Sequence, residues 1–509
     1  MEIGTNGAQP PNAALLAAHP LIIAANRGPV EFARGDDGAF THRRGSGGVV
    51  TAMSALGRYV DPIWVASAMT EGDRQVATAA GGEPVVVDDE GEPPLKIHFA
   101  TVPPETYDLA YNQISNEMLW FLQHYLWDAA QEPDIDQQVW RAWDVGYSIL
   151  NLTFANTIHR AAELAKSEQP IVLLQDYHLY LTAALVRARL PHALIQQFIH
   201  IPWPDKDYWM FLPARMRQEI CRGLLANDVV GFQTYDHCHN FIRTCVANVP
   251  GAEGDHEWLC VRHEGRTVRV RCYPISLDVA AVRRTAANET VAEYIDVLQD
   301  YLGEQTILRV DRAEPSKNVL RGFKAFDLFL ERYPEWLGRV RFLALLVPSR
   351  LAVPRYQRYL DDIYALMGRI NTKHGTETWR PVRLLVSENY ERALAALTLY
   401  DALLVNSLAD GMNLVAKEGA LLNDRGGVLI LSETAGAHEQ LGAQALSITP
   451  CDIAGTADAL HTALTMPTEE RFRRAAALRE SVEQADIVRW ITDQIDDIAA
   501  VAREPRVQT

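Results

Sequence analysis

Residues 406–422, NSLADGMNLVAKEGALL, place an acid and a glycine between an apolar run and a helical pattern. The apolar run predicts a buried strand, so Asp410 and Gly411 stand in a loop at its carboxyl end, where an open α/β sheet binds its ligand. The alternative is that Asp410 only caps the helix and Gly411 only permits the turn. If the loop binds an anion such as a diphosphate, the donors would be unpaired N–H groups of the first helical turn, those of Met412, Asn413 and Leu414.

Residues 311–318, DRAEPSKN, form a second loop of this kind, with two cations five positions apart across a turn that contains proline. Arg312 and Lys317 could both reach one phosphate group, and the helix predicted to begin near Asn318 adds the positive end of its dipole. The alternative is a solvated turn in which Ser316 caps the helix.

Loops in the first half of the chain carry a similar set of residues. Arg27 follows the apolar run 21–25, with the glycines 47–48 further along, and Asp176 and His200 follow two successive apolar runs. The acid and the imidazole could bind sugar hydroxyls or shuttle a proton. The alternatives are that Arg27 pairs with a surface acid, that Asp176 caps a helix and that His200 is a satisfied core imidazole.

Together these loops favour a diphosphate leaving group on one side and a polyhydroxyl acceptor on the other. Arg350 is a further cation at a strand end. The sequence contains neither GxxxxGK[ST] nor GxGxxG around Arg27, which argues against P-loop or ordinary dinucleotide chemistry. Without HExxH or clustered Asp residues, neither a metal nor a cofactor is expected. Electrostatic help for the leaving group would come from Arg312, Lys317 and backbone amides.

The composition favours an ordinary two-domain protein of the cytoplasm. With 509 residues and 48% hydrophobic content, the chain can bury two substantial cores. The formal net charge of -17 argues against a nucleic-acid or anionic-membrane partner. The six cysteines form no CxxC pair and are expected to be reduced. There is no signal-peptide pattern and no apolar run of about 18 residues, so no membrane span is expected.

Short apolar runs alternate with helix-length segments and predict mostly parallel sheets covered on both faces. A first series of strands is predicted at 21–25, 171–174, 194–199, 229–232 and 268–273. A second series is predicted at 306–310, 342–347, 383–386, 402–405 and 428–431. Between strands of the first series we expect a hairpin-like region at 63–102 and helices at 112–127 and 138–166. Helices of the second series are expected at 319–332, 355–373 and 391–399.

The predicted fold class is α/β, with two Rossmann-like doubly wound domains facing across a cleft. Residues 1–20 would be a flexible lead-in, 21–277 the N-terminal domain and 278–483 the C-terminal domain, joined by a linker at 274–280. The last segment, 484–509, has an apolar stripe and is expected to cross back to the N-terminal domain.

The chain resembles the trehalose-6-phosphate synthases, family 20 retaining glycosyltransferases of the GT-B fold, over nearly its whole length after residue 20. Ten motifs in order carry the resemblance: NR at 26–27, GG at 47–48, YNQxSN…LW at 111–120, DYHL at 176–179, HIPW at 200–203, GFQT at 231–234, R….K at 312–317, PSR at 348–350, GRIN at 368–371 and DGMNLVAKE at 410–418.

The resemblance implies a role for individual residues. Those implied to bind the donor, a nucleoside-diphosphate glucose, are Gly48, Arg312, Lys317, Tyr390, Asp410, Met412, Asn413, Leu414, Val415 and Glu418. Those implied to bind the acceptor, glucose 6-phosphate, are Arg27, Tyr111, Trp120, Asp176 and Arg350. Those implied to act at the reacting centre are Arg312, Lys317, His200, Asp176 and Asp410. Acting on such small molecules, the enzyme would form α,α-trehalose 6-phosphate without a metal, by attack on the same face of the glucose; no pair of carboxylates for double displacement is evident.

One position departs from the family pattern. Ser67 stands where family members commonly carry a second tryptophan three residues after the one matching Trp64. A pseudo-glycosyltransferase of validamycin biosynthesis is similar in this segment, so a synthase with another acceptor, glycerol 3-phosphate or a cyclitol phosphate, stays open. A catalytically silent regulatory subunit is a remoter alternative. The identity of the donor base and the oligomeric state, a homo-oligomer included, are left open by the sequence.

Overall fold

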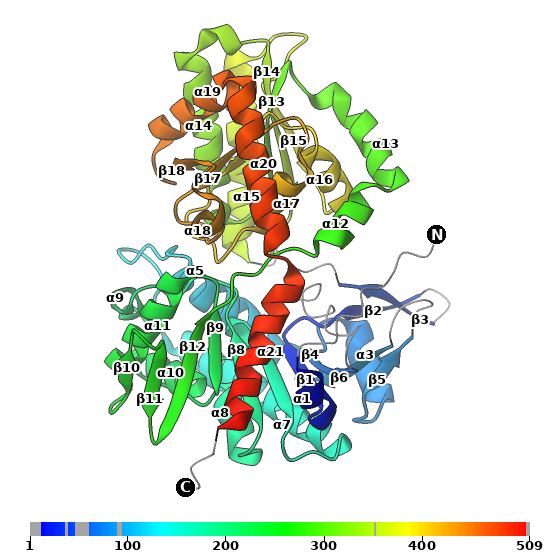
Figure 1. Cartoon of the computed structure of the whole chain (residues 1–509), viewed down its shortest axis with the longest axis vertical. Helices are drawn as coiled ribbons and strands as arrows, with labels where there is room; N and C mark the ends of the chain where they lie inside the picture. Colours follow the sequence, from blue (N-terminus) through cyan, green and yellow to red (C-terminus); the bar gives the residue numbers. More distant parts are fainter. Residues whose placement is uncertain (1–11, 36–38, 46–60, 89–93, 351–352, 505–509) are drawn as a thin grey trace. The chain divides into compact units, whose positions relative to one another are not determined.

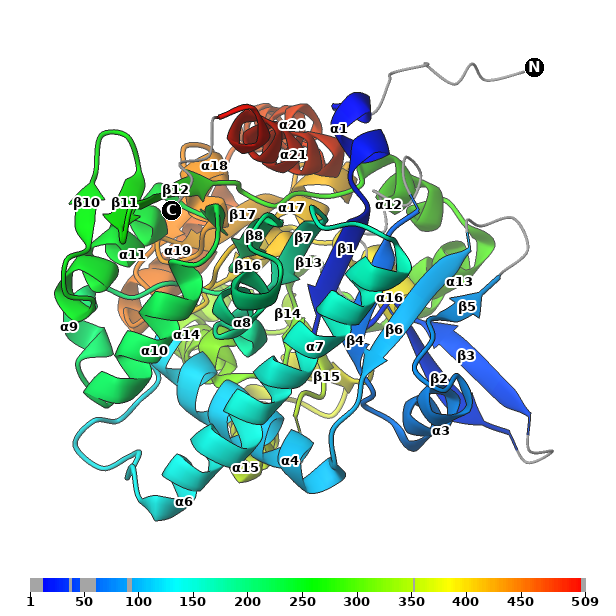
Figure 2. The same ribbon diagram turned by 90° about the horizontal axis from the view of Figure 1, so that it is seen from below.

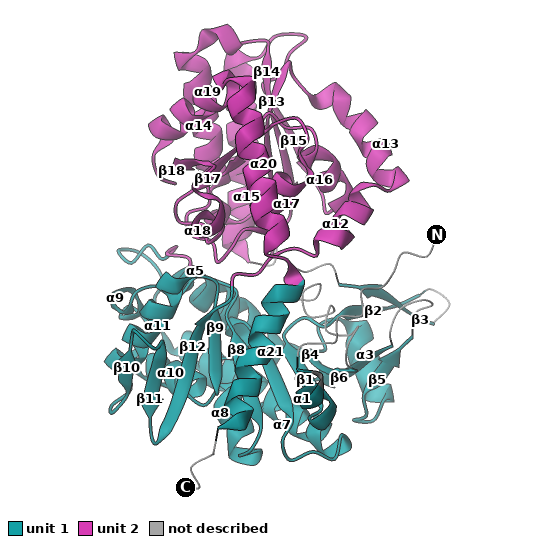
Figure 3. Cartoon of the chain, in the orientation of Figure 1, with its two compact units in different colours: residues 1–123, 127–273, 488–509 teal, residues 124–126, 274–487 magenta. Residues whose placement is uncertain are grey.

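The computed structural model describes residues 12–35, 39–45, 61–88, 94–350 and 353–504. The chain divides into two compact units, coloured separately in Figure 3. Unit 1 comprises residues 1–123, 127–273 and 488–509, and unit 2 comprises residues 124–126 and 274–487. The sequence predicted domain boundaries after residues 277 and 483. In the structure the chain enters the long segment of unit 2 after residue 273 and returns to unit 1 after residue 487.

Unit 2 contains a six-stranded, fully parallel sheet in the order β15-β14-β13-β16-β17-β18. The strands are β13 (Gln305–Arg312), β14 (Val340–Val347), β15 (Val382–Val386), β16 (Ala402–Val405), β17 (Val428–Ser432) and β18 (Leu446–Ile448). The chain starts at a central strand, winds outward to β15, returns to β16 and winds outward in the other direction. The strand order therefore reverses between β13 and β16, which is where a doubly wound sheet opens a ligand crevice.

Helices of unit 2 cover both faces of this sheet. They are α12 (Val279–Ala286), α13 (Glu289–Leu298), α14 (Val319–Arg332), α15 (Pro354–His374), α16 (Tyr390–Leu397), α17 (Leu414–Leu422), α18 (Ala437–Leu441), α19 (Ile453–Thr465) and α20 (Thr468–Gln484). Figure 1 shows α14 and α19 side by side. The main core contains Phe323 and Phe326 of α14, with Phe342 of β14 edge-on to both rings.

Unit 1 contains a ten-stranded sheet in the order β10-β11-β12-β9-β8-β7-β1-β4-β6-β5, in which only β11 and β5 run antiparallel to the other strands. The strands are β1 (Leu21–Ala25), β4 (Ile63–Ser67), β5 (Val85–Val87), β6 (Leu95–Ala100), β7 (Ile171–Gln175), β8 (Leu194–Phe198), β9 (Val229–Phe232), β10 (Glu253–Asp255), β11 (Cys260–His263) and β12 (Arg266–Cys272). A separate hairpin pairs β2 (Val30–Arg34) with β3 (Phe40–Arg44). The strand order reverses between β1 and β7.

The helices of unit 1 include several that depart from α geometry. The α-helices are α1 (Ala13–Ala18), α3 (Glu71–Ala79), α4 (Pro104–Asp108), α5 (Trp120–Gln123), α6 (Gln137–Arg141), α7 (Ser148–Leu164), α8 (Thr182–Arg189), α9 (Lys206–Trp209), α10 (Ala214–Leu224), α11 (Tyr235–Asn248) and α21 (Ile487–Arg503). Two π-helical segments, η2 (Leu109–Leu119) and η3 (Ala142–Tyr147), lie between α4 and α5 and between α6 and α7. Figure 2 shows α7 lying over β1, β4 and β6.

Residues 13–18 of the predicted lead-in form α1. The predicted doubly wound α/β units are confirmed, but two local predictions were wrong. The region 63–102 is not a simple hairpin, because α3 connects the parallel strands β4 and β6. The helix predicted at 112–127 begins earlier and ends at Gln123. The predicted linker 274–280 begins where the chain passes from unit 1 to unit 2 and runs into α12, which starts at Val279 with Asp278 as its N-cap.

From Val488 onward, α21 belongs to unit 1, where its apolar stripe is buried. Trp490 donates a hydrogen bond from Nε1 to the carbonyl of Tyr273 at 3.1 Å and meets Phe198 edge to face, with ring centroids 5.1 Å apart. The amide of Gln494 accepts from Gln196 at 2.7 Å. The buried face of α21 is therefore part of the core of unit 1. Among the described residues, no helix combines the length and apolar character needed to cross a membrane.

Candidate functional site

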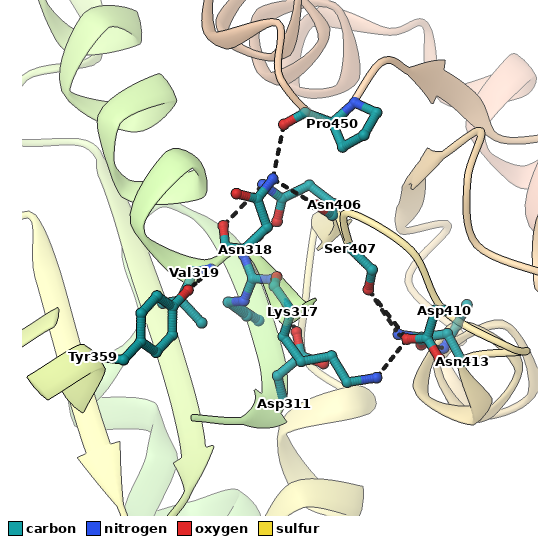
Figure 4. Close-up of polar contacts among 12 residues, drawn as sticks. Asp311, Lys317, Asn318, Val319, Tyr359, Asn406, Ser407, Asp410, Asn413 and Pro450 are labelled. Atoms are coloured by element: carbon teal, nitrogen blue, oxygen red, sulfur yellow. Dashed lines mark hydrogen bonds and ion pairs between the residues drawn. The ribbon is translucent and has the colours of Figure 1, made fainter. Parts of the chain in front are cut away.

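In unit 2 the loops that follow β13 and β16 are tied together at the point where the strand order reverses. Figure 4 shows Asn318 between the two loops: its side-chain amide donates to the carbonyl of Asn406 at 2.9 Å and to that of Pro450 at 2.7 Å. The side-chain amide of Asn406 returns a bond to the carbonyl of Asn318 at 3.2 Å. Asn318 has φ 58, a left-handed conformation that asparagine tolerates better than most residues. These bonds fix the loops that carry the predicted donor residues.

Lys317 and Asp410, predicted from separate motifs, form an ion pair in this region (Figure 4). The same carboxylate oxygen, Oδ2 of Asp410, accepts from Ser407 at 3.2 Å and from Asn413 at 3.1 Å. Burial pushes the pKa of Asp410 upward, but Lys317 and Asn413 outweigh it and hold the pKa below its usual value. Asp410 is therefore ionised, and its Oδ1 has no partner among the described residues, so it can accept from a ligand hydroxyl.

The turn around Asp410 depends on a close approach of two glycines. A Cβ at Gly436 would lie 1.9 Å from the carbonyl oxygen of Gly411, so no side chain fits there. The N–H of Gly436 donates to the carbonyl of Asp410 at 3.0 Å. The loop after β17 therefore supports the loop that carries Asp410.

A buried ion pair lies beneath these loops, and sequence reasoning missed it. Arg309 and Asp311, both inside β13, are 3.0 Å apart. Arg309 also donates to the side chain of Asn406 at 2.5 Å and to the carbonyl of Lys317. Since a buried guanidinium requires several acceptors, Arg309 fixes the β13 loop against the β16 loop. Its position inside an apolar strand pattern gave no signal of a site.

Arg312 does not share a partner with Lys317, although the two were predicted to act together. Its side chain is 51% exposed and pairs with the buried carboxylate of Glu314 at 2.9 Å. The same oxygen of Glu314 accepts from Ser349 at 2.7 Å and lies 3.6 Å from Arg350. Sequence reasoning also missed Glu314, which reads as an ordinary acid in a turn.

At the start of α17 the backbone presents unpaired donors. Asn413, not Asp410, occupies the N-cap, and its side chain accepts from the N–H of Ala416 at 3.1 Å. The N–H groups of Leu414 and Val415 have no acceptor among the described residues and lie at the positive end of the helix dipole. The alternative that Asp410 caps this helix is therefore wrong. Met412 is buried at the same turn.

Further along α17, Glu418 is paired with Tyr390, which begins α16. The tyrosine hydroxyl donates to Oε1 of Glu418 at 3.2 Å. Burial raises the pKa of Glu418 to about 7, although the bond from Tyr390 opposes the shift. The preceding residue, Lys417, is fully buried and donates from Nζ to the carbonyl of Ile275 at 2.7 Å. Burial lowers the pKa of Lys417 to about 7, and no sequence signal indicated this position.

In unit 1, the loops at the reversal between β1 and β7 are connected through hydrogen bonds between neutral groups. Asn26, directly after β1, is buried and accepts from the hydroxyl of Ser67 at 2.9 Å. It also donates to the hydroxyl of Tyr107 at 3.1 Å. The next residue, Arg27, is exposed and has no hydrogen-bond or ion-pair partner among the described residues. The alternative that Arg27 pairs with a surface acid finds no support there.

Aromatic rings connect the two loops of unit 1. Tyr107 stacks on Tyr111 with centroids 5.3 Å apart, and Tyr111 stacks on His178 at 5.7 Å. His178 follows β7 by three residues, so the stack spans from the β1 side to the β7 side. Trp120 lies at the start of α5 and is only 2% exposed, which leaves a ligand little of its surface to touch.

Asp176 and His200 follow neighbouring strands, as predicted, and they are in contact. The carboxylate of Asp176 accepts from the backbone N–H of His200 at 3.2 Å. Asp176 has φ 68 and ψ −179, a region that almost only glycine occupies, and its side chain caps no helix. The ring of His200 bonds through Nε2 to the amide oxygen of Gln175 at 3.0 Å. Burial lowers the pKa of His200 to about 3, so the ring is neutral near pH 7.

Four of the nine non-glycine residues with positive φ in the described chain lie in these loops. They are Asp176, Asn318, Arg350 and Asn413. Strained backbone of this kind concentrates at functional sites. Gly48, predicted to lie against the diphosphate, and its neighbour Gly47 fall outside the described residues. Within the described ranges, no group of three His, Cys, Asp or Glu side chains is arranged to hold a metal ion.

Known proteins resemble this chain over nearly its full length. A bifunctional trehalose-6-phosphate synthase/phosphatase of Thermoproteus tenax is 34% identical over 504 residues, covering 95% of this chain and 64% of that protein. The chain therefore spans less than two thirds of that relative. An α,α-trehalose-phosphate synthase [UDP-forming] of Schizosaccharomyces pombe is 32% identical, covering 89% of this chain and 85% of the other. A validamine 7-phosphate valienyltransferase of Streptomyces hygroscopicus is 28% identical, covering 94% of each chain.

Solved structures agree with the sequence comparison. An E. coli structure with UDP-2-fluoro glucose has a TM-score of 0.80 at 27% identity, covering 94% of this chain and 98% of that one. A Burkholderia xenovorans trehalose-phosphate synthase in complex with glucose-6-phosphate has a TM-score of 0.78 at 26% identity, covering 94% of this chain and 100% of that one. The two doubly wound units thus form the GT-B fold. The model of glycosyltransferase family 20 matches residues 19–500, and the chain belongs to that family.

Proposed function

We propose that the protein transfers glucose from UDP-glucose to glucose 6-phosphate and forms α,α-trehalose 6-phosphate. The observation that carries the proposal is the ion pair between Lys317 and Asp410, beside the unpaired amides of α17. A cation and helix amides suit a diphosphate, and an ionised acid with an available oxygen suits a sugar hydroxyl. The choice of UDP and glucose 6-phosphate rests on the names of the relatives and on the ligands of the two solved structures.

On the donor side, Lys317, Arg312 and the N–H groups of Leu414 and Val415 would take the diphosphate. These groups would stabilise the charge that develops on the leaving group, and fixed donors of this kind need no reorganisation during the reaction. Asp410, with the amides of Met412 and Asn413, would hold the glucose, and Gly48 would lie against the diphosphate. Glu418 would accept from the ribose hydroxyls, with Tyr390 near the base.

On the acceptor side, the exposed guanidinium of Arg27 would take the 6-phosphate, together with Arg350, Tyr111 and the edge of Trp120. Asp176 would accept from the acceptor hydroxyls. His200, neutral and with Nε2 donating to Gln175, would leave Nδ1 to accept from a sugar hydroxyl. Because the ring is neutral near pH 7, we assign it to binding and not to acid catalysis.

The reaction would retain the anomeric configuration without a protein nucleophile or a metal. The departing diphosphate would accept the proton of the attacking hydroxyl on the same face of the glucose. Asp410 is occupied by Lys317, Ser407 and Asn413 through one oxygen. It would orient the sugar and not attack it.

A second candidate is transfer to a cyclitol phosphate, favoured by Ser67 and by the similarity to the valienyltransferase. Incubation with UDP-glucose and each acceptor, followed by proton NMR of the product, separates the candidates. Two α-anomeric signals in a product made from glucose 6-phosphate support the proposal. Robust turnover with glycerol 3-phosphate or a cyclitol phosphate, and none with glucose 6-phosphate, would refute it.

A further inference from the structure

Glu314 is a buried acid between two arginines that the proposed function assigns to different substrates. Its carboxylate is fully buried in unit 2, 2.9 Å from Arg312 and 3.6 Å from Arg350. Arg312 is assigned to the donor diphosphate and Arg350 to the acceptor phosphate. One carboxylate thus lies next to both of the arginines that would bind the two substrates.

The backbone places Glu314 at the apex of the β13 loop. Its N–H donates to the carbonyl of Arg312 at 2.8 Å, and its carbonyl accepts from the N–H of Lys317 at 3.0 Å. Both cations of the predicted diphosphate site are therefore bonded through their backbones to this one residue. Its side chain points to the strand-end loop after β14, where Ser349 donates to Oε1 at 2.7 Å.

The carboxylate remains charged despite its burial. Burial alone would raise the pKa of Glu314, but Arg312, Arg350, Lys317 and the hydroxyl of Ser349 bring it down to about 2. A buried charge is tolerated only when it is paired in this way. Oε1 is the oxygen that contacts Arg312, Arg350 and Ser349, while Oε2 is buried without a partner among the described residues.

We propose that Glu314 is a positioning residue that holds Arg312 and Arg350 in the orientations needed to bind the two phosphate-bearing substrates. Its bond uses one of the five guanidinium donors of Arg312, and the 51% exposed head keeps the others for a phosphate. Holding a long side chain in one orientation before binding removes an entropy cost that the substrate would otherwise bear. This inference rests on the proposed function for the identity of the two phosphates.

A simpler role for Glu314, neutralisation of the local positive charge, predicts a change in UDP affinity in the opposite direction. If the carboxylate only reduced the local positive charge, Glu314→Gln would strengthen the attraction for an anion and UDP would bind more tightly. If Glu314 orients Arg312, the same substitution loosens the guanidinium and UDP binds about tenfold or more weakly, the scale of a lost charged hydrogen bond. The direction of the change therefore distinguishes orientation from neutralisation.

Isothermal titration calorimetry of UDP into the full-length protein measures this direction without any turnover. Glu314→Asp keeps the charge but shortens the reach, so we expect it to weaken UDP binding, whereas neutralisation predicts no change. Ser349→Ala removes only the hydroxyl bond and should weaken UDP binding by roughly threefold. Ser349→Ala also covers the case in which both Glu314 variants fail to fold. The matched control is Asp458→Asn, which breaks the surface pair with Arg332 at 2.7 Å and should leave UDP binding unchanged.

Steady-state kinetics test whether Glu314 also orients Arg350. We expect Glu314→Gln to raise the KM for glucose 6-phosphate and to lower kcat, because both phosphates are misaligned. Wild-type or tighter UDP affinity in Glu314→Gln, with wild-type affinity in Glu314→Asp and Ser349→Ala, would overturn the inference. If the wild-type enzyme binds UDP but does not turn over glucose 6-phosphate, the acceptor of the proposed function is wrong, while the calorimetric result still decides the role of Glu314.

Discussion

In unit 2 the two loops at the reversal of strand order are joined by charges, whereas in unit 1 the corresponding loops are joined by aromatic rings and neutral hydrogen bonds. In unit 2, Lys317 pairs with Asp410. In unit 1, Tyr111 stacks between Tyr107 and His178. The same topology thus supports two chemistries. Fixed charges suit an anionic leaving group, while stacked rings and amides suit a neutral sugar ring.

The two units also differ in how the chain builds them. Unit 2 is almost continuous in sequence, but unit 1 is completed by residues after 487. Trp490, 3% exposed, reaches from α21 to the end of β12. The core of unit 1 therefore depends on the last segment of the chain, and each contrast between the units can be tested by substitution.

The largest expected effect is on the stability of unit 1. Trp490→Ala removes a buried ring and should lower the free energy of unfolding by about 3–5 kcal/mol. Urea unfolding followed by circular dichroism measures it. Val488→Ala is the control, since Val488 lies on the same helix but is 41% exposed and should cost much less. Equal, small losses in both variants would mean that unit 1 does not need α21.

The next effect concerns the charges of unit 2. Arg312→Ala and Lys317→Ala should each reduce kcat by about 10²-fold or more, the scale of losing one preorganised charge-stabilising group. A coupled assay of UDP release measures the change. Lys324, an exposed cation of α14, provides the control as Lys324→Ala, which should keep wild-type turnover. Near-wild-type rates in both site variants would show that the diphosphate site is misplaced.

A smaller effect is expected from the aromatic stack of unit 1. Tyr111→Ala should raise the KM for glucose 6-phosphate by about tenfold, because stacking of a ring contributes roughly 0.5–1.5 kcal/mol beyond its buried area. Tyr111→Phe keeps the ring stack but removes the hydroxyl that would donate to the 6-phosphate, so it should recover only part of the affinity. The KM for UDP-glucose should not change in either variant. A shift in the donor KM instead would contradict the division between the units.

The smallest expected effect is on the pH dependence of kcat/KM for UDP-glucose, through Glu418. Burial raises the pKa of Glu418 to about 7, so the carboxyl is protonated below pH 7 and loses acceptor capacity for the ribose hydroxyls. We expect kcat/KM for UDP-glucose to rise severalfold between pH 6 and 8. Glu418→Gln should be less active above pH 7 and should lack this rise. The same rise in the variant would assign the titration to another group.

Regular elements could be predicted from the sequence with good accuracy where an apolar pattern matched a single structure. The runs 21–25, 229–232 and 402–405 are the strands β1, β9 and β16, and the pattern at 319–332 is α14. The helix α3 was missed because little of it is buried, although Thr70 and Asp73 form a capping box that could have indicated it.

The site was predicted less completely, since partners distant in the chain cannot be read from one loop. No local pattern indicated that Lys317 would pair with Asp410 while Arg312 pairs with Glu314. A buried charge such as Arg309 lies within an apolar strand pattern, and the pattern alone does not show that the side chain has a partner. Left-handed residues such as Asp176 depend on tertiary contacts, which local propensity does not describe.

The most direct test of the division between the units is calorimetric binding of UDP to Lys317→Ala and to Arg27→Ala, each compared with the wild-type protein. Lys317 belongs to the charged loops of unit 2, and Arg27 is an exposed cation at the β1 loop of unit 1. We predict that UDP affinity falls by about tenfold or more in Lys317→Ala, as expected for a lost charged hydrogen bond, and is unchanged in Arg27→Ala. Loss of UDP binding in Arg27→Ala with retention in Lys317→Ala would contradict the account.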